Sequence, residues 1–424
     1  MEKPEQRSLP VVRSSRRSLL KTSMALGALG AAARPLAAVA DTASNGTVTL
    51  PFANGERPTV AAGTFPQKGE MILQRTRPPL LETPWSVFEK SLFTPNDQAY
   101  VRWHMNDFPR AVDVSNFKLK VFGEVEKPYE LTLAELVSSF PATQIAAVNQ
   151  CSGNSRGFVS PRVAGAQWAH GAMFNAMFTG VSLAKLLARA GVKPGASHVA
   201  FRSLETLQAP FPAADRFEKV LPLDRATNGA TTVAYEMNGA QMPLLNGFPL
   251  RLVVPGWYAT YWVKMLSEIE VLNHPGTGFW MSTAYKIPNN PTGAMTPGQA
   301  GVTMVPINSM VPRSFFTVPA ANRSVSVGKA AHLKGFAFGG DSALKSVQIS
   351  VDGGSNWHEA KLGKNWGEYG AREWTSGFTP PKAGTYTIMV KASNMAGFEQ
   401  PMQAVWNPGG FMYNAIEHID LQAS

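Results

Sequence analysis

The chain has 424 residues, 44% of them hydrophobic, and a formal net charge of +10. This length indicates two or three domains with ample core-forming residues. Residues 1–40 hold seven basic and two acidic side chains and so carry half of the net charge. The remaining excess is small and scattered, which argues against nucleic acid as a partner. Beyond residue 40 no apolar run is long enough to span a bilayer, so no membrane insertion is expected.

Cys151 is the only cysteine in the chain. One cysteine cannot form an internal disulfide, and an iron–sulfur cluster, a zinc–thiolate site or a covalently attached c-type haem each needs at least two. We therefore expect none of these groups, and no haem. A lone cysteine is most often a small buried residue, so its neighbours in the sequence must decide whether it has a functional role.

The N-terminus has the three parts of an export signal. Arg16 and Arg17 stand in the pattern Ser-Arg-Arg-Ser-Leu-Leu-Lys, which is typical of a twin-arginine signal. An apolar run over residues 24–33 follows, and then an Ala-Val-Ala cleavage site that ends at Ala40. We expect a cleaved signal peptide over residues 1–40 and a periplasmic mature protein. Twin-arginine export carries folded proteins, often those that must first receive a cofactor.

The mature chain divides into three stretches. Residues 41–95 are rich in Pro, Thr and Gly without periodicity, and we expect an extended N-terminal arm. Residues 96–290 mix strand and helix patterns, such as an alternating strand over 117–122 and a helix over 132–140 with a capping box. Residues 291–424 show short alternating strands between turn signals, which predicts an immunoglobulin-like sandwich. The expected fold class is α+β followed by an all-β domain.

The surroundings of Cys151 read Asn-Gln-Cys-Ser-Gly-Asn-Ser-Arg. This segment resembles the cysteine loop of the sulfite oxidase family, Cys-x-Gly-Asn-x-Arg, whose thiolate is the one protein ligand of molybdenum. The resemblance implies that Cys151 binds the metal of a molybdenum–molybdopterin cofactor, with one molybdenum per chain. Gly153 would let the backbone approach this bulky cofactor, and Arg156 would supply positive charge to the substrate site.

A second segment, residues 100–104, reads Tyr-Val-Arg-Trp-His and resembles the family's Phe-Val-Arg-x-His. The resemblance implies that Arg102 lies beside the metal and binds the substrate oxyanion, because a guanidinium binds oxyanions through charge-assisted hydrogen bonds. His104 would hold the hydrogen-bond network or bind the pterin phosphate. Both residues are expected to serve catalysis and cofactor binding. Without the family, Arg-x-His on a loop favours an ordinary surface cation.

The longest match comprises residues 234–239, 247–256 and 262–264, and it resembles the family's pterin-binding core. The resemblance implies that Arg251 binds the cofactor's phosphate. The chain at Trp262, Val263 and Lys264 would cradle the pterin. Asn246 stands where eukaryotic members have histidine, and its amide can still hydrogen-bond the pterin. The Asn-Gly pair within 234–239 also predicts a tight hairpin turn.

Three further positions match the family. Residues 278–286 resemble the stretch that brings an active-site tyrosine to the metal, which implies that Tyr285 hydrogen-bonds the reacting group and assists proton transfer. Trp168 matches a tryptophan that walls the substrate pocket, although a core role fits it nearly as well. His418 stands where the vertebrate enzymes have a third arginine, so that cation is expected to be weaker or absent.

The resemblance covers essentially the whole mature chain and implies a fold and a function. The fold is a sulfite-oxidase-type molybdopterin-binding catalytic domain over residues 96–290, followed by an immunoglobulin-like dimerisation domain over residues 291–424. The expected function is that of a sulfite dehydrogenase, which oxidises sulfite to sulfate and passes the electrons to an external c-type cytochrome. A homodimer is expected from the same resemblance.

Three alternatives remain open. The chain could be the molybdenum subunit of a thiosulfate-oxidising complex, or a sulfoxide reductase of the same family. The paired Arg102 and Arg156 favour a small oxyanion, and the dimerisation domain argues against the reductase, which lacks it. The non-enzymatic alternative is an exported immunoglobulin-like binding module. That alternative leaves the Cys151 segment unexplained, and metal analysis would decide it.

Overall fold

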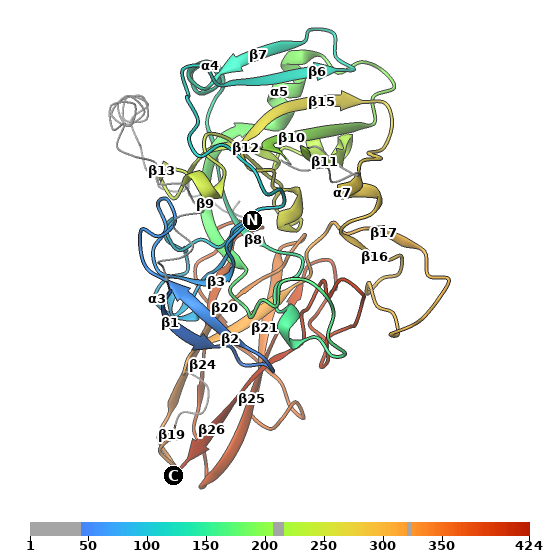
Figure 1. Ribbon diagram of the computed structural model, residues 1–424. Helices are drawn as coiled ribbons and strands as arrows, with labels where there is room; N and C mark the ends of the chain where they lie inside the picture. The colour runs from blue at the N-terminus through green and yellow to red at the C-terminus, as the bar shows by residue number, and fades with distance from the viewer. Residues whose placement is uncertain (1–43, 207–215, 320–323) are drawn as a thin grey trace, which may run out of the picture.

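The computed structural model describes residues 44–206, 216–319 and 324–424. The expected signal peptide, residues 1–40, lies outside the described residues. Within the described ranges, no helix is both long and apolar enough to cross a membrane. Figure 1 shows a mixed part, coloured blue to yellow, above a part built from the orange and red strands of the C-terminal third.

The residues expected to form an extended arm fold into a sheet instead. From Ser44 onward the chain forms an antiparallel sheet whose strands follow chain order: β1 (Ser44–Thr49), β2 (Glu56–Val60), β3 (Met71–Arg75), β4 (Leu80–Glu82) and β5 (Val101–Arg102). Helix α3 (Trp85–Lys90) lies between β4 and β5. The strands are too short to show alternation in the sequence. They are stabilised by a tertiary core that includes Met71, Leu81 and Trp103.

Two further sheets share one hydrophobic core and build the part expected to be catalytic, residues 96–290, which is called the catalytic part below. The first has the order β11 (Arg216–Pro222), β10 (His198–Thr206), β15 (Leu266–Leu272), β6 (Lys118–Gly123) and β7 (Tyr129–Thr132). The second has the order β13 (Ala240–Gln241), β12 (Thr232–Met237), β9 (Met173–Ser182) and β8 (Thr143–Gln150), with β14 (Arg251–Val253) also paired to β12. Helices α4 (Leu133–Ser139), α5 (Leu183–Ala190) and α6 (Leu223–Thr227) contribute to the same core.

Local sequence signals explain how the helices begin and end. The Thr132 side chain accepts a hydrogen bond from Glu135 N–H, and the Glu135 carboxylate accepts one from Thr132 N–H, which is the expected capping box. Helix α5 ends at Gly191, whose φ of 69° suits a residue without a Cβ. The Asn-Gly turn between β12 and β13 is also confirmed, with φ of 53° at Asn238 and 73° at Gly239.

The C-terminal part is the predicted two-layer sandwich. It follows helix α7 (Phe279–Ser282) and the hairpin of β16 (Lys286–Pro288) and β17 (Met304–Pro306). One sheet has the order β18 (Arg313–Val318), β20 (Ala331–Phe338), β24 (Arg372–Phe378) and β23 (Lys361–Leu362). The other has the order β19 (Ser324–Val325), β26 (Glu417–Ala423), β25 (Gly384–Asn394), β21 (Leu344–Ser350) and β22 (His358–Glu359). Trp374 of one sheet and Ile388 of the other lie in the same core.

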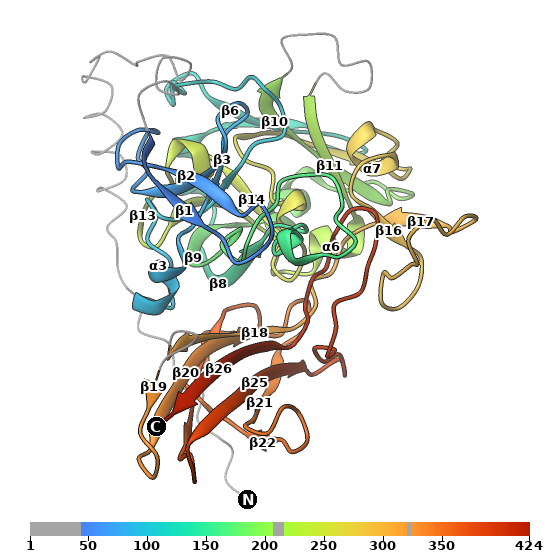
Figure 2. The same cartoon turned by 60° about the horizontal axis from the view of Figure 1, so that its bottom comes forward.

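The connection between β25 and β26, residues 395–416, leaves the sandwich and reaches the catalytic part (Figure 2). Met412 N–H donates a hydrogen bond to Ser152 O at 3.1 Å, directly beside Cys151. The C-terminal part is therefore hydrogen-bonded to the residue next to Cys151.

Candidate active site

Cys151 directly follows β8 and begins a loop that backbone hydrogen bonds hold in place. Cys151 N–H donates to Ala172 O at 2.9 Å, and Ser155 N–H donates to Ala169 O at 2.7 Å. Ser155 has a φ of 68°, in the left-handed region that few residues other than glycine adopt. The loop between these two bonds is therefore fixed, and with it the position of the Cys151 thiol.

Cys151 lines a narrow cavity within the catalytic part, and eight of the eleven predicted site residues line it together. The predicted residues at the cavity are Cys151, Arg102, His104, Asn246, Arg251, Trp262, Lys264 and Tyr285. The other lining residues are Tyr100, Ser152, Phe217, Leu245, Ala259 and Thr260. Side chains from distant parts of the chain, Arg102 and Tyr285 among them, thus line one cavity together with the thiol.

Arg156, Trp168 and Val263 are the predicted residues that do not line this cavity. Trp168 is 1% exposed, and its ring packs edge-on against that of Tyr100, a lining residue. Val263 is fully buried, and its backbone carbonyl accepts a hydrogen bond from Leu252 N–H at 2.8 Å. Trp168 therefore packs behind Tyr100, a residue of the cavity wall. Val263 only holds the backbone of Leu252.

Arg156 lies behind the cysteine loop with its guanidinium held by carbonyl groups. Its Nε donates to Gly409 O at 2.8 Å and its Nη1 to Ala166 O at 3.0 Å. Burial lowers its pKa, while the nearby Cys151 thiol raises it. A Cβ at any of three glycines would overlap the Arg156 side chain, namely at Gly153, Gly165 and Gly410. These glycines leave room for a cation that adds positive potential beside the thiol.

Tyr285 and His104 form a hydrogen-bonded pair at the cavity. The Tyr285 hydroxyl lies 2.7 Å from His104 Nε2, and the Tyr285 ring stacks on Phe411 with 5.7 Å between centroids. Burial raises the pKa of Tyr285 to about 12, although Arg102 lowers it, so the hydroxyl is protonated at neutral pH. Burial and the charge of Arg102 hold the pKa of His104 well below its usual value, so the imidazole is neutral.

Cations outnumber acids around this pair. Lys264 Nζ donates to Arg102 O at 2.9 Å. The one carboxylate that this part of the site buries, Glu205, accepts hydrogen bonds from the backbone N–H groups of His104 and Met105 at 3.2 and 3.1 Å. Burial lowers the pKa of Lys264 to about 8, with Glu205 opposing that shift. Such a cluster favours an anionic occupant.

Asn246 and Arg251 line the cavity and are hydrogen-bonded to each other. Arg251 Nη1 donates to Asn246 O at 2.9 Å, and Asn246 Nδ2 donates to Tyr100 O at 3.2 Å. The Asn246 side-chain oxygen accepts a hydrogen bond from Lys68 Nζ at 3.0 Å. Burial lowers the pKa of Arg251 to about 10, so it stays charged. Lys68 lies in the connection between β2 and β3, and no motif predicted its presence here.

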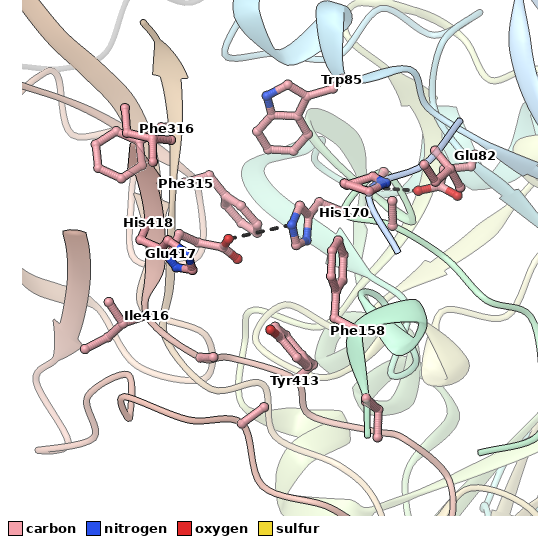
Figure 3. Close-up of a pocket in the computed structure, with 18 of the residues that line it drawn as sticks. Glu82, Trp85, Phe158, His170, Phe315, Phe316, Tyr413, Ile416, Glu417 and His418 are labelled. Atoms are coloured by element: carbon pink, nitrogen blue, oxygen red, sulfur yellow. Dashed lines mark hydrogen bonds and ion pairs between the residues drawn. The ribbon is translucent and has the colours of Figure 1, made fainter. Parts of the chain in front are cut away.

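A ring of polar contacts ties the cysteine loop to the C-terminal sandwich. The Ser155 hydroxyl lies 2.8 Å from His170 Nδ1 and accepts a hydrogen bond from Arg313 Nη1 at 2.9 Å. Arg313 Nη2 donates to Glu417 at 2.7 Å, and Glu417 lies 3.6 Å from His170 Nε2. Figure 3 shows the His170–Glu417 contact across the boundary of the two parts. Since Arg313 is fully buried, this ring stabilises the loop conformation from behind.

A larger cavity of about 860 Å³ opens on the far side of this ring, between aromatic side chains that include Trp85, Phe158 and Tyr413 (Figure 3). None of the eleven predicted site residues lines it. His418 does line it, on strand β26 opposite Met389. His418 is therefore not a third cation beside Cys151.

Arg75 is a candidate substrate-binding residue that the sequence motifs did not reveal. Leu80 pairs with Arg75 on one side and with Arg102 on the other, so the two arginines share one row of the N-terminal sheet. Residues in one row point to the same face. A register shift between Leu73 and Arg75 brings Arg75 into this row. Burial and the charge of Arg102 lower the pKa of Arg75, while Tyr285 raises it. Arg75 could be identified only from the strand register, which cannot be read from the sequence.

We expect Arg75→Gln to raise the Michaelis constant for an oxyanion substrate about threefold, with kcat nearly unchanged, because an exposed cation in the same row as Arg102 attracts the anion without touching the reacting atoms. The dependence of kcat/KM on ionic strength should also weaken. Arg77→Gln removes the same charge two residues away, where Arg77 Nε donates to Asn106 O, and is the control. Equal effects of the two variants would contradict a specific role of Arg75.

The comparisons with known proteins agree with this geometry. Residues 105–280 match the family model of the oxidoreductase molybdopterin binding domain, and residues 304–423 match that of the Mo-co oxidoreductase dimerisation domain. The fold and the site thus define a molybdopterin-dependent oxidoreductase with a dimerisation domain. That domain supports the expected homodimer.

Two curated relatives define the family more closely. The chain is 31% identical to sulfite oxidase of Gallus gallus, over 84% of this chain and 78% of the relative, and 30% identical to sulfite oxidase of Arabidopsis thaliana, over 80% and 91%. The chain belongs to the sulfite oxidase family. The structure of the sulfane dehydrogenase SoxCD from Paracoccus pantotrophus is similar in fold, with a TM-score of 0.66 and 24% identity over 80% of this chain and 83% of that one. These findings confirm the resemblance and the fold class, while the individual residue roles stay predictions.

The residues around Cys151 fit the cofactor that the molybdopterin-binding domain implies. Four buried polar atoms of the lining residues have no hydrogen-bond partner among the described residues: His104 Nδ1, Ser152 Oγ, Arg251 Nε and Thr260 Oγ1. Unpaired buried polar groups are rare in folded proteins, and four of them around one cavity leave hydrogen-bonding capacity for an occupant. The cavity combines a thiol, several cations and these free donors and acceptors, which suits a metal held by an anionic, hydrogen-bonding pterin.

Proposed function

We propose that this protein is a sulfite dehydrogenase, which oxidises sulfite to sulfate at a molybdenum centre and passes two electrons to an external c-type cytochrome in the periplasm. The observation that carries the proposal is the meeting of Cys151, Arg102 and the Tyr285–His104 pair at one cation-rich cavity. The two relatives at about 30% identity, both named sulfite oxidase, support it. The twin-arginine signal of the sequence supports the location.

Residues that line the cavity would hold the cofactor. Cys151 would bind the metal through its thiolate, and Arg251 and Asn246 would bind polar groups of the pterin. Lys264 and the chain at Trp262 would also contact the pterin. When bound, the molybdenum cofactor supplies the two-electron oxidant and the oxygen-transfer chemistry.

The chain's own residues would bind sulfite and donate a hydrogen bond to it. The Arg102 guanidinium binds the oxyanion through charge-assisted hydrogen bonds, and Arg156 adds positive potential as charge builds on the transferring oxygen. The Tyr285 hydroxyl, protonated at neutral pH, donates a hydrogen bond to the oxyanion. Neutral His104 holds this hydroxyl in place through Nε2. The cations at the cavity, Arg102 and Lys264 among them, favour a small oxyanion over a bulky sulfoxide.

A combined metal and activity assay tests the proposal. The purified protein should contain about one molybdenum per chain and should reduce cytochrome c when sulfite is added. Thiosulfate and methionine sulfoxide, with a matching electron acceptor or donor, test the two enzymatic alternatives under the same conditions. Absence of molybdenum from a cofactor-competent preparation would favour the binding module. Turnover of thiosulfate or sulfoxide without turnover of sulfite would replace the proposed substrate.

A further inference from the structure

Lys219 is a buried cation that none of the motifs and none of the steps above explains. It lies on β11 with 0% of its side chain exposed, and its Nζ donates a hydrogen bond to Trp280 O at 2.6 Å. Within the part of the chain that the structure describes, no carboxylate forms an ion pair with it. Buried lysines are otherwise almost always paired, because taking a charge out of water without a counter-charge is strongly unfavourable.

The surroundings of Lys219 belong to the active site. Its Nζ lies 4.5 Å from the centroid of the Tyr261 ring and 5.3 Å from that of Tyr285. The carbonyl that it binds belongs to Trp280 of α7, the short helix that leads into Tyr285. Tyr285 itself has a φ of 58°, a left-handed backbone conformation that needs support from its surroundings.

A second buried lysine, Lys68, differs from Lys219 in the number of its hydrogen bonds. Lys68 is 3% exposed and donates three hydrogen bonds, to Asn96 O at 2.9 Å, Ala99 O at 2.6 Å and the Asn246 side chain at 3.0 Å. Burial lowers the pKa of Lys68 and of Lys219 to about 7 in each case. Lys68 is thus bound as a structural group, whereas Lys219 has a single carbonyl and two aromatic faces.

We propose that Lys219 is a positioning residue of the active site, which fixes the short helix α7 before Tyr285 and, when protonated, places a positive charge against the Tyr285 ring. Its hydrogen bond to Trp280 O holds α7 in place, so the Tyr285 hydroxyl stays hydrogen-bonded to His104 Nε2. A cation at the face of a phenol ring also strengthens the hydroxyl as a hydrogen-bond donor. Arg102 acts on the same ring, with its guanidinium carbon 5.7 Å from the centroid. Lys219 acts through Tyr285 and does not touch the substrate.

The test compares function with stability in Lys219→Met, which keeps the length of the side chain and removes its charge. If Lys219 positions Tyr285, kcat of Lys219→Met for sulfite should be about tenfold lower than that of the wild type. The melting temperature of this variant should stay equal or rise, because a buried amine without an ion-pair partner has been removed. Lys219→Arg, which keeps the charge, should retain more of kcat than Lys219→Met. The matched control is Lys68→Met, which leaves three acceptors unpaired and should lower the melting temperature.

The inference rests on the proposed function, so the test includes a measurement that does not need turnover. Sulfate affinity of the holoenzyme, measured by calorimetry, should be about threefold weaker in Lys219→Met, since Tyr285 would donate less well to the oxyanion. Wild-type protein without sulfite turnover would defeat the proposed function, while the sulfate measurement would still decide the role of Lys219. Unchanged sulfate affinity, or a fall in melting temperature of both Lys219 variants as large as that of Lys68→Met, would overturn the inference.

Discussion

Cys151→Ser is expected to abolish sulfite-dependent reduction of cytochrome c. A serine hydroxyl stays protonated at neutral pH, and its oxygen is a poor substitute for a thiolate at a sulfur-ligated metal. The fold should survive, because the change is nearly isosteric and the backbone bond from residue 151 to Ala172 O does not depend on the side chain. Turnover, molybdenum content and melting temperature are measured on the same preparation.

Cys151→Ala is the companion variant, since it removes the ligand without offering an oxygen. Both variants should melt within a few degrees of the wild type and differ from it in turnover. Full turnover by either variant would show that the thiol does not bind the metal, and the proposed mechanism would be wrong.

Arg102→Gln is expected to raise the Michaelis constant for sulfite roughly 30-fold. Loss of a charge-assisted hydrogen bond to an anion is worth about 2 kcal/mol, and about 1.4 kcal/mol corresponds to a factor of ten. Because the Arg102 guanidinium also lies against the Tyr285 ring, kcat should fall as well. Steady-state kinetics at fixed ionic strength measures both constants.

Arg102→Lys separates charge from geometry. A lysine keeps the positive charge and loses the two-pronged donor arrangement, so its Michaelis constant should lie between those of the wild type and Arg102→Gln. Arg75→Gln, which removes a cation outside the cavity lining, should change the constant far less. If Arg102→Gln left the Michaelis constant for sulfite unchanged, Arg102 would not be the oxyanion-binding residue.

The motifs predicted most of the cavity lining because each motif occupies one short stretch of chain. Cys151, Arg102 and Tyr285 belong to three such stretches, and the structure brings all three to one cavity. Arg156 belongs to a motif as well, yet its side chain turns toward Gly409 and Ala166 instead of lining the cavity. A motif fixes where a residue stands in the chain, while the direction of a long side chain depends on the glycines and carbonyls packed around it.

The expected extended arm was wrong for a related reason. Strands of three to six residues carry too little alternation to be recognised, and their stability comes from pairing with neighbours and from a core that the catalytic part completes. Arg75 of this sheet shares a row with Arg102, and Lys68, between β2 and β3, hydrogen-bonds Asn246 from outside the cavity lining. Neither residue belongs to a motif, so both became visible only through register and packing.

The sequence by itself determined the lone thiol, the cation-rich segments that accompany it, the family to which they belong and the order of a mixed domain followed by an all-β one. These properties are local, because each depends on residue types at fixed short spacings. The tertiary structure alone decided that Lys219 lies buried against Tyr285, that Arg75 shares a row with Arg102, and that His418 faces another cavity. Such relations join residues far apart in the chain, and they depend on strand register, burial and desolvation, which exist only once the chain has folded.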